Sequence, residues 1–471
     1  MREVEVGAVS LDRLASVLEE KQAERLLRYA EHARKLLAGR TVWNVNATAQ
    51  GGGVAEMLQA LLAYTRGARV ATRWLVLDGD PEFFTTTKRL HNVLHGMPGD
   101  GGPLGPAEQE HYTEVLRKNA EQLGPMVQPG DIVLLHDPQT AGLAPMLAGG
   151  GAHIVWRCHI GRDTPTELTD LGWGFLHPHL QAAEGFIFSR RTYAPSWVPD
   201  ERLWVIPPSL DPFTAKNAEL TPADVDAALL QAGLTEASED HGSIVFTRRD
   251  GSSGMVRRHH GLVLDGAPLS RGARLVIQVS RWDRLKDMAG VMSGFAAHVR
   301  QFPPDVHLML IGPDVAGVSD DPEGAEVLQE CLGLWETLPA AVRRRVHLVC
   351  LPMDDVDENA HLVNALQRRA AVVVQKSIVE GFGLTVTEPM WKARPVVASA
   401  VGGIQDQIIH GESGLLLDDP LDLDTFAALV AEVLTDEEEA RRLGTAARSR
   451  VRDQFLGDRH LMQYVDLFER L

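Results

Sequence analysis

The spacing of apolar and polar positions changes repeatedly along the chain, and these changes predict alternating helices and strands. Residues 10–39 carry apolar side chains at helical spacing among charges, a pattern typical of an amphipathic helix. A strand-like run over 41–47 follows and ends at three glycines, 51–53. A helix pattern over 54–67 and a strand pattern over 69–77 come next. We therefore predict a β-loop-α-β unit with a glycine-rich first loop.

Short apolar runs continue this alternation through both halves of the chain. We expect further strands at 131–137, 152–159, 185–189 and 203–208, and then at 274–280, 306–312, 345–351, 370–375 and 394–399. Helical patterns follow at 422–434 and 436–454. Alternating strands and helices predict mostly parallel sheets with helices on both faces. The expected fold class is α/β, with two Rossmann-like, doubly wound domains facing each other across a cleft.

The middle of the chain interrupts this pattern, because residues 214–270 are polar and rich in glycine and their strand signals are weak. We interpret them as a linker plus an insertion, for which a mobile hairpin is one form. The first domain is then expected at 1–213 and the second at 271–450, with 451–471 as a C-terminal helix that packs back on the first domain. A length of 471 residues agrees with two domains, since it exceeds the size that one hydrophobic core supports.

Composition limits the classes of protein that remain. No apolar run is long enough to span a bilayer, and the N-terminus lacks the apolar core of a signal peptide. The three cysteines are scattered, which fits a reducing cytoplasm. A formal charge of −18 argues against nucleic acid or an anionic membrane as partner. An exposed apolar stripe over 10–39 would suit a homodimer.

Glu380 and Glu388 lie eight positions apart on either side of a Gly-Phe-Gly-Leu turn. A β-branched strand pattern precedes Glu380, and a helix pattern begins after the turn, so Glu388 is expected just over one turn into that helix. The C-terminal edge of a parallel sheet is where open α/β folds bind ligands, and glycines let helix N-terminal amides approach an anion. The pair therefore predicts a nucleotide-sugar site. The alternative is two glutamates that only complement a helix dipole.

Two further features strengthen the prediction of a phosphate-binding site. Arg281 and Lys286 stand in the loop after a strand, where cations could clamp a diphosphate and stabilise a leaving group. The glycines at 51–53 could turn their amides toward a phosphate or a reacting sugar. Solvated basic side chains and a plain tight turn are the alternatives. The glycine loop has neither the dinucleotide fingerprint nor the P-loop pattern, which counts against dehydrogenases and ATPases.

Histidines and carboxylates also stand at strand ends in the first half of the chain. His136-Asp137 and His159 each end an apolar run, and we expect them at an acceptor or donor-sugar site rather than in purely structural roles. Asp78 and Asp80 follow another strand in a pattern that holds a divalent metal in a different class of sugar transferases. No third ligand is apparent from the sequence, so we expect no metal.

These motifs together resemble the retaining GT-B glycosyltransferases of family four, over nearly the whole chain apart from roughly 235–270. More narrowly, the chain resembles the trehalose glycosyltransferring synthases in NATAQGGGVAEML, the run from Trp74 through EFFTTTKRLHNVLHG, HDPQTAGL, WRCHI and QVSRWDRLKD. It departs from them at Asp78-Gly79-Asp80 and in the 235–270 insertion. The resemblance implies a retaining transfer of glucose from a nucleoside diphosphate glucose to free glucose, giving α,α-trehalose, without a cofactor or metal.

The resemblance also implies roles for individual residues. Glu388 would bind the donor ribose, Glu380 the hydroxyls of the transferred glucose, and His159 the donor sugar near its 6-hydroxyl. Arg281 and Lys286 would hold the diphosphate. Backbone amides of a further set would place sugar and phosphate: Gly52, Gly53, Phe382, Gly383, Leu384 and Thr385. The acceptor would meet Lys88, His91, Asn92 and Asp137.

Three other functions stay open on the sequence alone. They are a transferase with another sugar or polyol acceptor, a trehalose phosphorylase, and a non-catalytic sugar-nucleotide sensor. The donor base is equally open among UDP-, ADP- and GDP-glucose. In each enzymatic case water must be kept from the donor, so we expect the two domains to close over the substrates.

Overall fold

The computed structural model describes 1–49, 53–236, 244–264, 268–315 and 322–471, and contacts divide the chain into two units. The first unit is Met1–Leu210 with Gln454–Leu471, and the second is Asp211–Asp453. The residues 214–270, which we expect to be a linker and insertion, belong to the second unit. No helix in the described residues has the length and apolar character needed to cross a membrane.

The first unit is built on a seven-stranded sheet that is parallel except for its first edge strand. Its strands lie in the order β1 (Arg2–Glu3), β3 (Thr72–Val76), β2 (Val42–Asn46), β4 (Ile132–His136), β5 (His153–Cys158), β6 (Gly185–Phe188) and β7 (Leu203–Val205). The chain passes from β2 to β3 on one side and then to β4 on the other. The topological switch point therefore lies at the carboxyl ends of β2 and β4, where open α/β sheets bind ligands.

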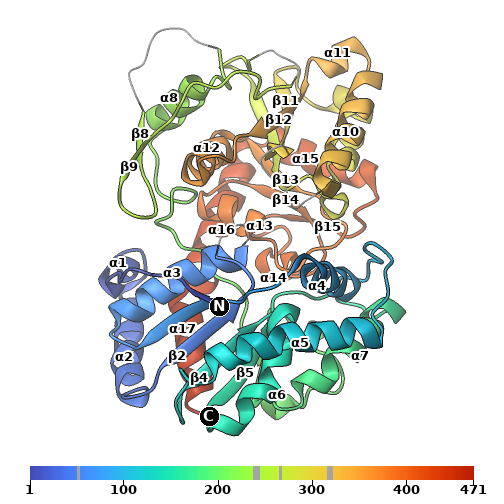
Figure 1. Ribbon diagram of the computed structural model, residues 1–471. Coiled ribbons are helices and arrows are strands. Elements are labelled where there is room, and N and C mark those ends of the chain that lie inside the picture. The colour runs from blue at the N-terminus through green and yellow to red at the C-terminus, as the bar shows by residue number, and fades with distance from the viewer. Residues whose placement is uncertain (50–52, 237–243, 265–267, 316–321) are drawn as a thin grey trace. The chain divides into compact units, whose positions relative to one another are not determined.

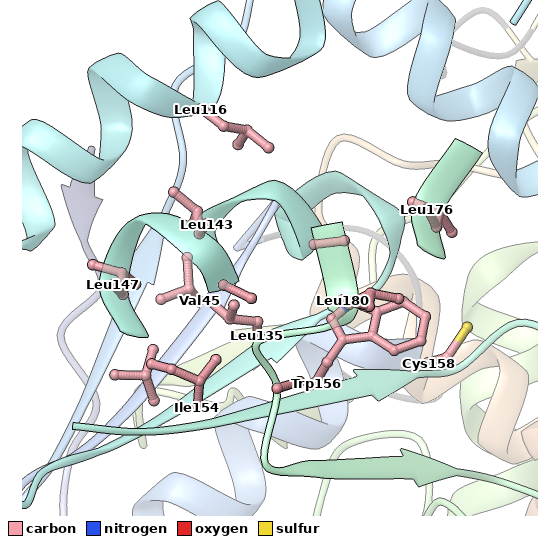
Figure 2. Packing of buried hydrophobic residues seen from close by; sticks show 14 of the residues in the cluster. Val45, Leu116, Leu135, Leu143, Leu147, Ile154, Trp156, Cys158, Leu176 and Leu180 are labelled. Carbon is pink, nitrogen blue, oxygen red and sulfur yellow. The ribbon is translucent and has the colours of Figure 1, made fainter. Parts of the chain in front are cut away.

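Alternate residues of these strands enter two different cores. Val45, Leu135 and Trp156 face one set of helices, which is α4 (Pro81–Leu94), α5 (Pro106–Leu123), α6 (Ala144–Leu147) and α7 (Glu167–Leu180). Figure 2 shows leucines of α5, α6 and α7 pointing onto these strand residues. The opposite face packs against α2 (Glu20–Leu36), α3 (Gly53–Gly67) and α17 (Gly457–Phe468), as Figure 1 shows. Every residue of β2 and β4 is buried, as expected for parallel strands that helices cover on both faces.

The helix predicted over 10–39 is interrupted, forming α1 (Leu11–Ala15) and α2. The Ser10 side chain caps α1, and the backbone N–H of Glu19 donates to the Gln22 side chain at 3.3 Å where α2 begins. The leucines that we expected to form an exposed stripe differ in burial: Leu14 and Leu26 pack with Tyr64 inside the unit, whereas Leu27 is 44% exposed. The exposed apolar surface is therefore smaller than expected, and it gives no support to a dimer.

The second unit has a six-stranded sheet in which all neighbouring strands are parallel. Its order is β12 (Val346–Leu351), β11 (Val306–Pro313), β10 (Arg274–Val279), β13 (Val372–Gln375), β14 (Val396–Ser399) and β15 (Leu415–Leu417). The chain runs from β10 through β11 to β12 and then returns to place β13 on the other side of β10. The switch point of this sheet lies between the carboxyl ends of β10 and β13.

Helices cover the second sheet as well. The main core joins the strands to α9 (Met288–Ala297), α10 (Pro322–Thr337) and α15 (Leu423–Thr435). α12 (Val356–Arg369) contacts β10, and α13 (Leu384–Trp391) contacts β13 and β14. The remaining helices are α8 (Pro222–Ala232), α11 (Ala340–Arg343), α14 (Ile404–Gln407) and α16 (Glu437–Gln454). Of the short 3-10 turns, η1 (Pro138–Leu143) belongs to the first unit and η5 (Arg284–Lys286) to the second.

The residues 214–270 contain the hairpin form that we considered for them. β8 (Val245–Thr247) pairs antiparallel with β9 (Ser253–Met255), and Figure 1 shows this hairpin and α8 beside α12. Ion pairs fasten the segment to the start of α12, including Arg249 with Asp357 at 2.9 Å and Arg257 with Glu358 at 2.5 Å.

Candidate functional site

The switch point of the second sheet brings Lys286 and Glu380 together. Lys286 ends the turn η5 after β10, and Glu380 lies in the loop after β13. Lys286 Nζ lies 2.5 Å from Glu380 Oε2, and the Ser377 hydroxyl donates to the same oxygen at 3.3 Å. The two side chains are only 16% and 10% exposed. The arrangement therefore holds an ammonium and a carboxylate side by side at the edge of the sheet where ligands bind.

A buried glutamine fixes the two loops against each other. Gln278, near the end of β10, donates from Nε2 to the Lys286 carbonyl at 2.6 Å. Its Oε1 accepts from the Lys376 backbone N–H at 3.0 Å. The Ile378 N–H also donates to the Leu285 carbonyl at 2.8 Å. Because every one of these groups is paired, the loops that carry Lys286 and Glu380 have a fixed relative position.

The glycine turn before α13 holds the start of that helix against Glu380. Gly383 has φ +86°, and a Cβ there would lie 3.1 Å from Glu380 Cγ. Gln407 donates to the Phe382 carbonyl at 2.5 Å and accepts from the Thr387 hydroxyl at 2.5 Å. The Val386 N–H donates to the Gly383 carbonyl at 2.9 Å, and the N-terminus of α13 lies at the turn, where helix N-terminal amides can bind anions.

Glu388 lies one turn into α13 and is almost fully buried. Its Oε2 accepts from Gln367 Nε2 at 3.1 Å, and its Oε1 lies 3.6 Å from Lys216 Nζ. Lys392 Nζ donates to Gln367 Oε1 at 2.7 Å, to Asn217 Oδ1 at 3.1 Å and to the Glu388 carbonyl at 3.2 Å. Burial lowers the pKa of Lys392 to about 7, although the nearby Glu388 acts in the opposite direction. We call Lys216, Asn217, Gln367 and Lys392 the Glu388 support group.

Arg281 is the more exposed of the two cationic residues predicted to bind the diphosphate. Its guanidinium lies 3.0 Å from Asp283, and its side chain is 54% exposed. It stands on the loop that follows β10, at the same edge of the sheet as Lys286. The structure thus brings Lys286 to Glu380, whereas Arg281 pairs with Asp283.

In the first unit, the switch point holds two histidines and an aspartate. Asn44 Oδ1 lies 3.1 Å from His136 Nε2, and His136 Nδ1 lies 3.2 Å from His159 Nε2. Asp137 accepts the His159 backbone N–H at 2.7 Å. Burial, reinforced by the charge of Arg157, lowers the pKa of His136 to about 3. Burial raises the pKa of Asp137 to about 7. Neutral histidines at this edge can exchange hydrogen bonds with sugar hydroxyls.

Beneath these histidines lies a buried cation that the sequence analysis did not single out. Arg157 on β5 is 1% exposed, and it contacts His460 at 2.6 Å, the Tyr464 hydroxyl and the Ile206 carbonyl at 3.0 Å. His460 in turn lies 2.8 Å from the Ser209 hydroxyl. Because His460 and Tyr464 belong to α17, the C-terminal helix completes the polar layer under the first switch point.

The other predicted site residues of the first unit lie on two helices. Lys88, His91 and Asn92 stand on α4, where Lys88 is exposed and the other two are half-buried. Gly53 is the first residue of α3. Gly51 and Gly52 lie outside the described residues.

Asp78 and Asp80 have partners within the chain. Asp80 caps α4 by accepting the Phe83 N–H at 2.8 Å and lies 2.9 Å from His111, while Asp78 pairs with the Met1 ammonium at 2.5 Å. Within the described ranges, no group of three or more His, Cys, Asp or Glu side chains is placed to hold a metal ion.

The Glu388 support group was missed because its members come from separated parts of the sequence. Only Lys392 has a local signal, since it follows Glu388 by four positions on one helix face. Lys216 and Asn217 stand in a polar segment without a motif, and Gln367 lies on a different helix. Nothing in the order of residues indicates that these elements meet.

Family models match both units of the chain. One that describes the trehalose synthase N-terminal domain matches residues 44–195. One that describes glycosyl transferases of group 1 matches residues 356–450. The second match includes Glu380 and Glu388. The chain is therefore a glycosyltransferase.

Individual relatives match the chain over more of its length than the family models do. The trehalose synthase of Rubrobacter xylanophilus is 34% identical over 439 residues, which cover 92% of this chain and 91% of that protein. The trehalose synthase of Pyrococcus horikoshii is 30% identical over 472 residues, covering 100% and 99%. The solved structure of the trehalose-6-phosphate synthase OtsA superposes with a TM-score of 0.68 at 15% identity, covering 92% of this chain and 99% of that one. The fold is the GT-B architecture of two Rossmann-like domains, and the chain belongs to the trehalose synthase family.

Proposed function

We propose that this enzyme transfers glucose from a nucleoside diphosphate glucose to free glucose with retention of the α-anomer, releasing α,α-trehalose and a nucleoside diphosphate. The observation that carries the proposal is the Lys286–Glu380 pair beside the Gly383 turn, at the switch point of the second sheet. The chain that forms this site is 34% identical to a trehalose synthase.

The donor-binding part of the proposal rests on the chemistry of the second unit. A nucleotide sugar presents ribose hydroxyls, a diphosphate and sugar hydroxyls in that order. Glu388 supplies a buried acceptor for the ribose, and the helix N-terminus with Lys286 and Arg281 supplies donors and charge for the diphosphate. Glu380 then accepts hydrogen bonds from hydroxyls of the transferred glucose. The order of groups along α13 and its preceding loop matches the order of groups along the ligand.

The proposed chemical step needs no protein nucleophile. The acceptor hydroxyl oxygen bonds to C1 of the donor glucose on the face from which the diphosphate oxygen departs, through an oxocarbenium-like transition state. The C1–O bond to phosphate breaks, and the acceptor proton moves to the departing phosphate oxygen. Negative charge grows on that oxygen, and Lys286, Arg281 and the α13 amides neutralise it. Because both bonds lie on one face of the sugar, the α configuration is kept.

For the acceptor we propose the first unit, with Asp137 after β4 and Lys88, His91 and Asn92 on α4. His159, after β5, would contact the donor sugar near its 6-hydroxyl. Neutral His159 can hydrogen-bond a sugar hydroxyl as donor or acceptor. Burial raises the pKa of Asp137 to about 7, so below that pH its protonated carboxyl group can also donate to a sugar hydroxyl. These groups suit an uncharged sugar.

The proposal is tested by offering UDP-, ADP- and GDP-glucose to the purified enzyme, each with glucose, other sugars and small polyols, and by analysing the products. A non-reducing disaccharide formed with glucose supports the proposal and identifies the donor base. Transfer only to another acceptor would contradict the trehalose product. Breakdown of trehalose that requires inorganic phosphate and no nucleotide would indicate a phosphorylase, and donor binding without any turnover would indicate a sensor.

A further inference from the structure

The short segment before α8 is held firmly against α12 on both sides of Lys216. Asn364 Nδ2 donates to the Ala215 carbonyl at 3.0 Å and to the Ala218 carbonyl at 2.8 Å. Arg368 Nη2 also donates to the Ala218 carbonyl at 2.9 Å. The backbone that carries Lys216 is thus anchored one residue before and two residues after it. Such anchoring fixes where its side chain emerges.

The two oxygens of the Glu388 carboxylate have different surroundings. Oε2 accepts from Gln367, and Gln367 is itself held by Lys392, which also binds Asn217. This buried part of the support group already orients the carboxylate. Oε1 faces Lys216 Nζ at 3.6 Å, which is longer than a direct hydrogen bond. The Lys216 side chain is 22% exposed, whereas Glu388 is 7% exposed, so the lysine is the more accessible member of the pair.

We propose that Lys216 is a donor-binding residue whose ammonium contacts the ribose of the nucleoside diphosphate sugar. The inference rests on the proposed function, because it takes Glu388 as the ribose-binding carboxylate. A ribose hydroxyl that donates its proton to Glu388 Oε1 still has lone pairs on its oxygen, and the Lys216 ammonium can donate a hydrogen bond to them. An oxygen about 2.8 Å from both Glu388 Oε1 and Lys216 Nζ fits the 3.6 Å separation of these atoms.

The distance between Lys216 and Glu388 differs from the other lysine contacts of this site. Lys286 and Glu380 approach to 2.5 Å, and Lys392 places three hydrogen bonds on oxygens while fully buried. Lys216 Nζ lies farther from Glu388 Oε1, at 3.6 Å. Its place at the ribose end of the site also separates it from Lys286 and Arg281, which belong to the diphosphate end.

The test measures binding by calorimetry for the wild type and for Lys216→Met, with the best-bound nucleoside diphosphate and with inorganic pyrophosphate. We expect the nucleoside diphosphate to bind Lys216→Met about tenfold more weakly, the loss of one charge-assisted hydrogen bond. The KM for the donor should rise by a similar factor, while kcat and pyrophosphate affinity stay near wild type. Lys216→Arg should recover part of the loss. With a 2′,3′-dideoxynucleoside diphosphate the same substitution should cost much less.

Two reference variants separate the possible failures. Lys118→Met removes an exposed lysine of α5 in the first unit and should bind all probes as the wild type does. Glu388→Gln should weaken nucleoside diphosphate binding whether or not Lys216 takes part. If Glu388→Gln binds normally, the proposed donor site is wrong. If Glu388→Gln binds weakly and Lys216→Met binds normally, the inference about Lys216 alone is overturned. An equal loss for the nucleoside diphosphate and for pyrophosphate, accompanied by a lower Tm, would also overturn it.

Discussion

Lys286 and Glu380 bring opposite charges into contact at the carboxyl end of the second sheet, where we propose that the departing diphosphate gains negative charge. Their salt bridge is largely shielded from solvent, so each charge acts through a lower effective dielectric than at an open surface. Gln278 holds the backbone of both loops through paired hydrogen bonds. The charges are therefore already oriented before substrate binds, which is the arrangement that makes electrostatic stabilisation effective.

Replacing Lys286 by methionine is predicted to lower kcat by about 100-fold or more, because a preorganised charge at the leaving group is lost. Initial-rate measurements with saturating donor check the effect, and thermal unfolding checks that the variant is folded. Lys118→Met serves as the matched control on an exposed helix face. A kcat near the wild-type value for Lys286→Met would contradict the role assigned to Lys286.

Lys392 makes the stability of the second unit depend on pH. Its pKa is about 7 in the folded chain, against an ordinary value of 10.5, so the unfolded chain binds more protons between these limits. The free energy of unfolding of the wild type should therefore rise with pH from about 7 to 10, relative to Lys392→Met, by at most about 1.4 kcal/mol per pH unit. Urea unfolding at several pH values measures the difference between the two proteins. A difference that does not change with pH would contradict the lowered pKa.

At the scale of single elements, the glycine turn before α13 combines a backbone requirement with a side-chain requirement. The left-handed conformation of Gly383 lets the chain enter α13, and the absence of a Cβ leaves room for Glu380 and Ile404. Gly383→Ala should lower the free energy of unfolding by about 1–2 kcal/mol and should lower turnover further by displacing Glu380. Gly333→Ala in α10 is the control, because a Cβ there meets nothing within 4 Å and alanine favours the helix. Chemical denaturation and initial-rate measurements compare the two variants. Equal free energies of unfolding and equal turnover for both would contradict this account of the turn.

The attachment of the 214–270 segment to α12 depends on a buried carboxylate. Glu358 is fully buried and receives Arg257 at 2.5 Å and His259 at 2.9 Å. Arg257→Ala should lower the free energy of unfolding by about 2–4 kcal/mol, because it leaves a buried charge with one partner fewer. Arg117→Ala, which removes exposed pairs within α5, should cost less than about 1 kcal/mol. Chemical denaturation of both variants compares them, and similar losses would argue against a special role for Glu358.

How far the sequence predicts these elements depends on how local their determinants are. The strands β4, β10 and β13 follow from continuous β-branched and leucine runs, which suit buried parallel strands. The break between α1 and α2 is marked by the new helix start at Glu19, whose N–H donates to Gln22, a signal that a 30-residue helical pattern conceals. β1 has only two residues and β15 only three, so neither shows a clear period. Glu380, Lys286 and His159 stand at strand ends, so the strand pattern predicts their place in the fold. The positions of Lys216, Gln367 and Arg157 depend on contacts between distant segments.

At the scale of the whole molecule, the two units share a plan and differ in the chemistry of their switch points. The first presents neutral histidines, an asparagine and Asp137, which suit the hydroxyls of an uncharged sugar. The second presents Lys286, Glu380 and a helix N-terminus, which suit a charged nucleotide sugar. In a protein with a net charge of −18, the proposed binding of a diphosphate depends on such local cations, so we expect donor affinity to fall as added salt screens them.

The most direct test of the central claim is an NMR analysis of the product formed from unlabelled nucleoside diphosphate glucose and glucose carrying ¹³C at C1. The account predicts that the label appears in the anomeric carbon of α,α-trehalose, with both C1 atoms in the α configuration, and that Glu380→Ala forms this product far more slowly. A label that stays in a free reducing end, or a β linkage at the transferred glucose, would contradict it.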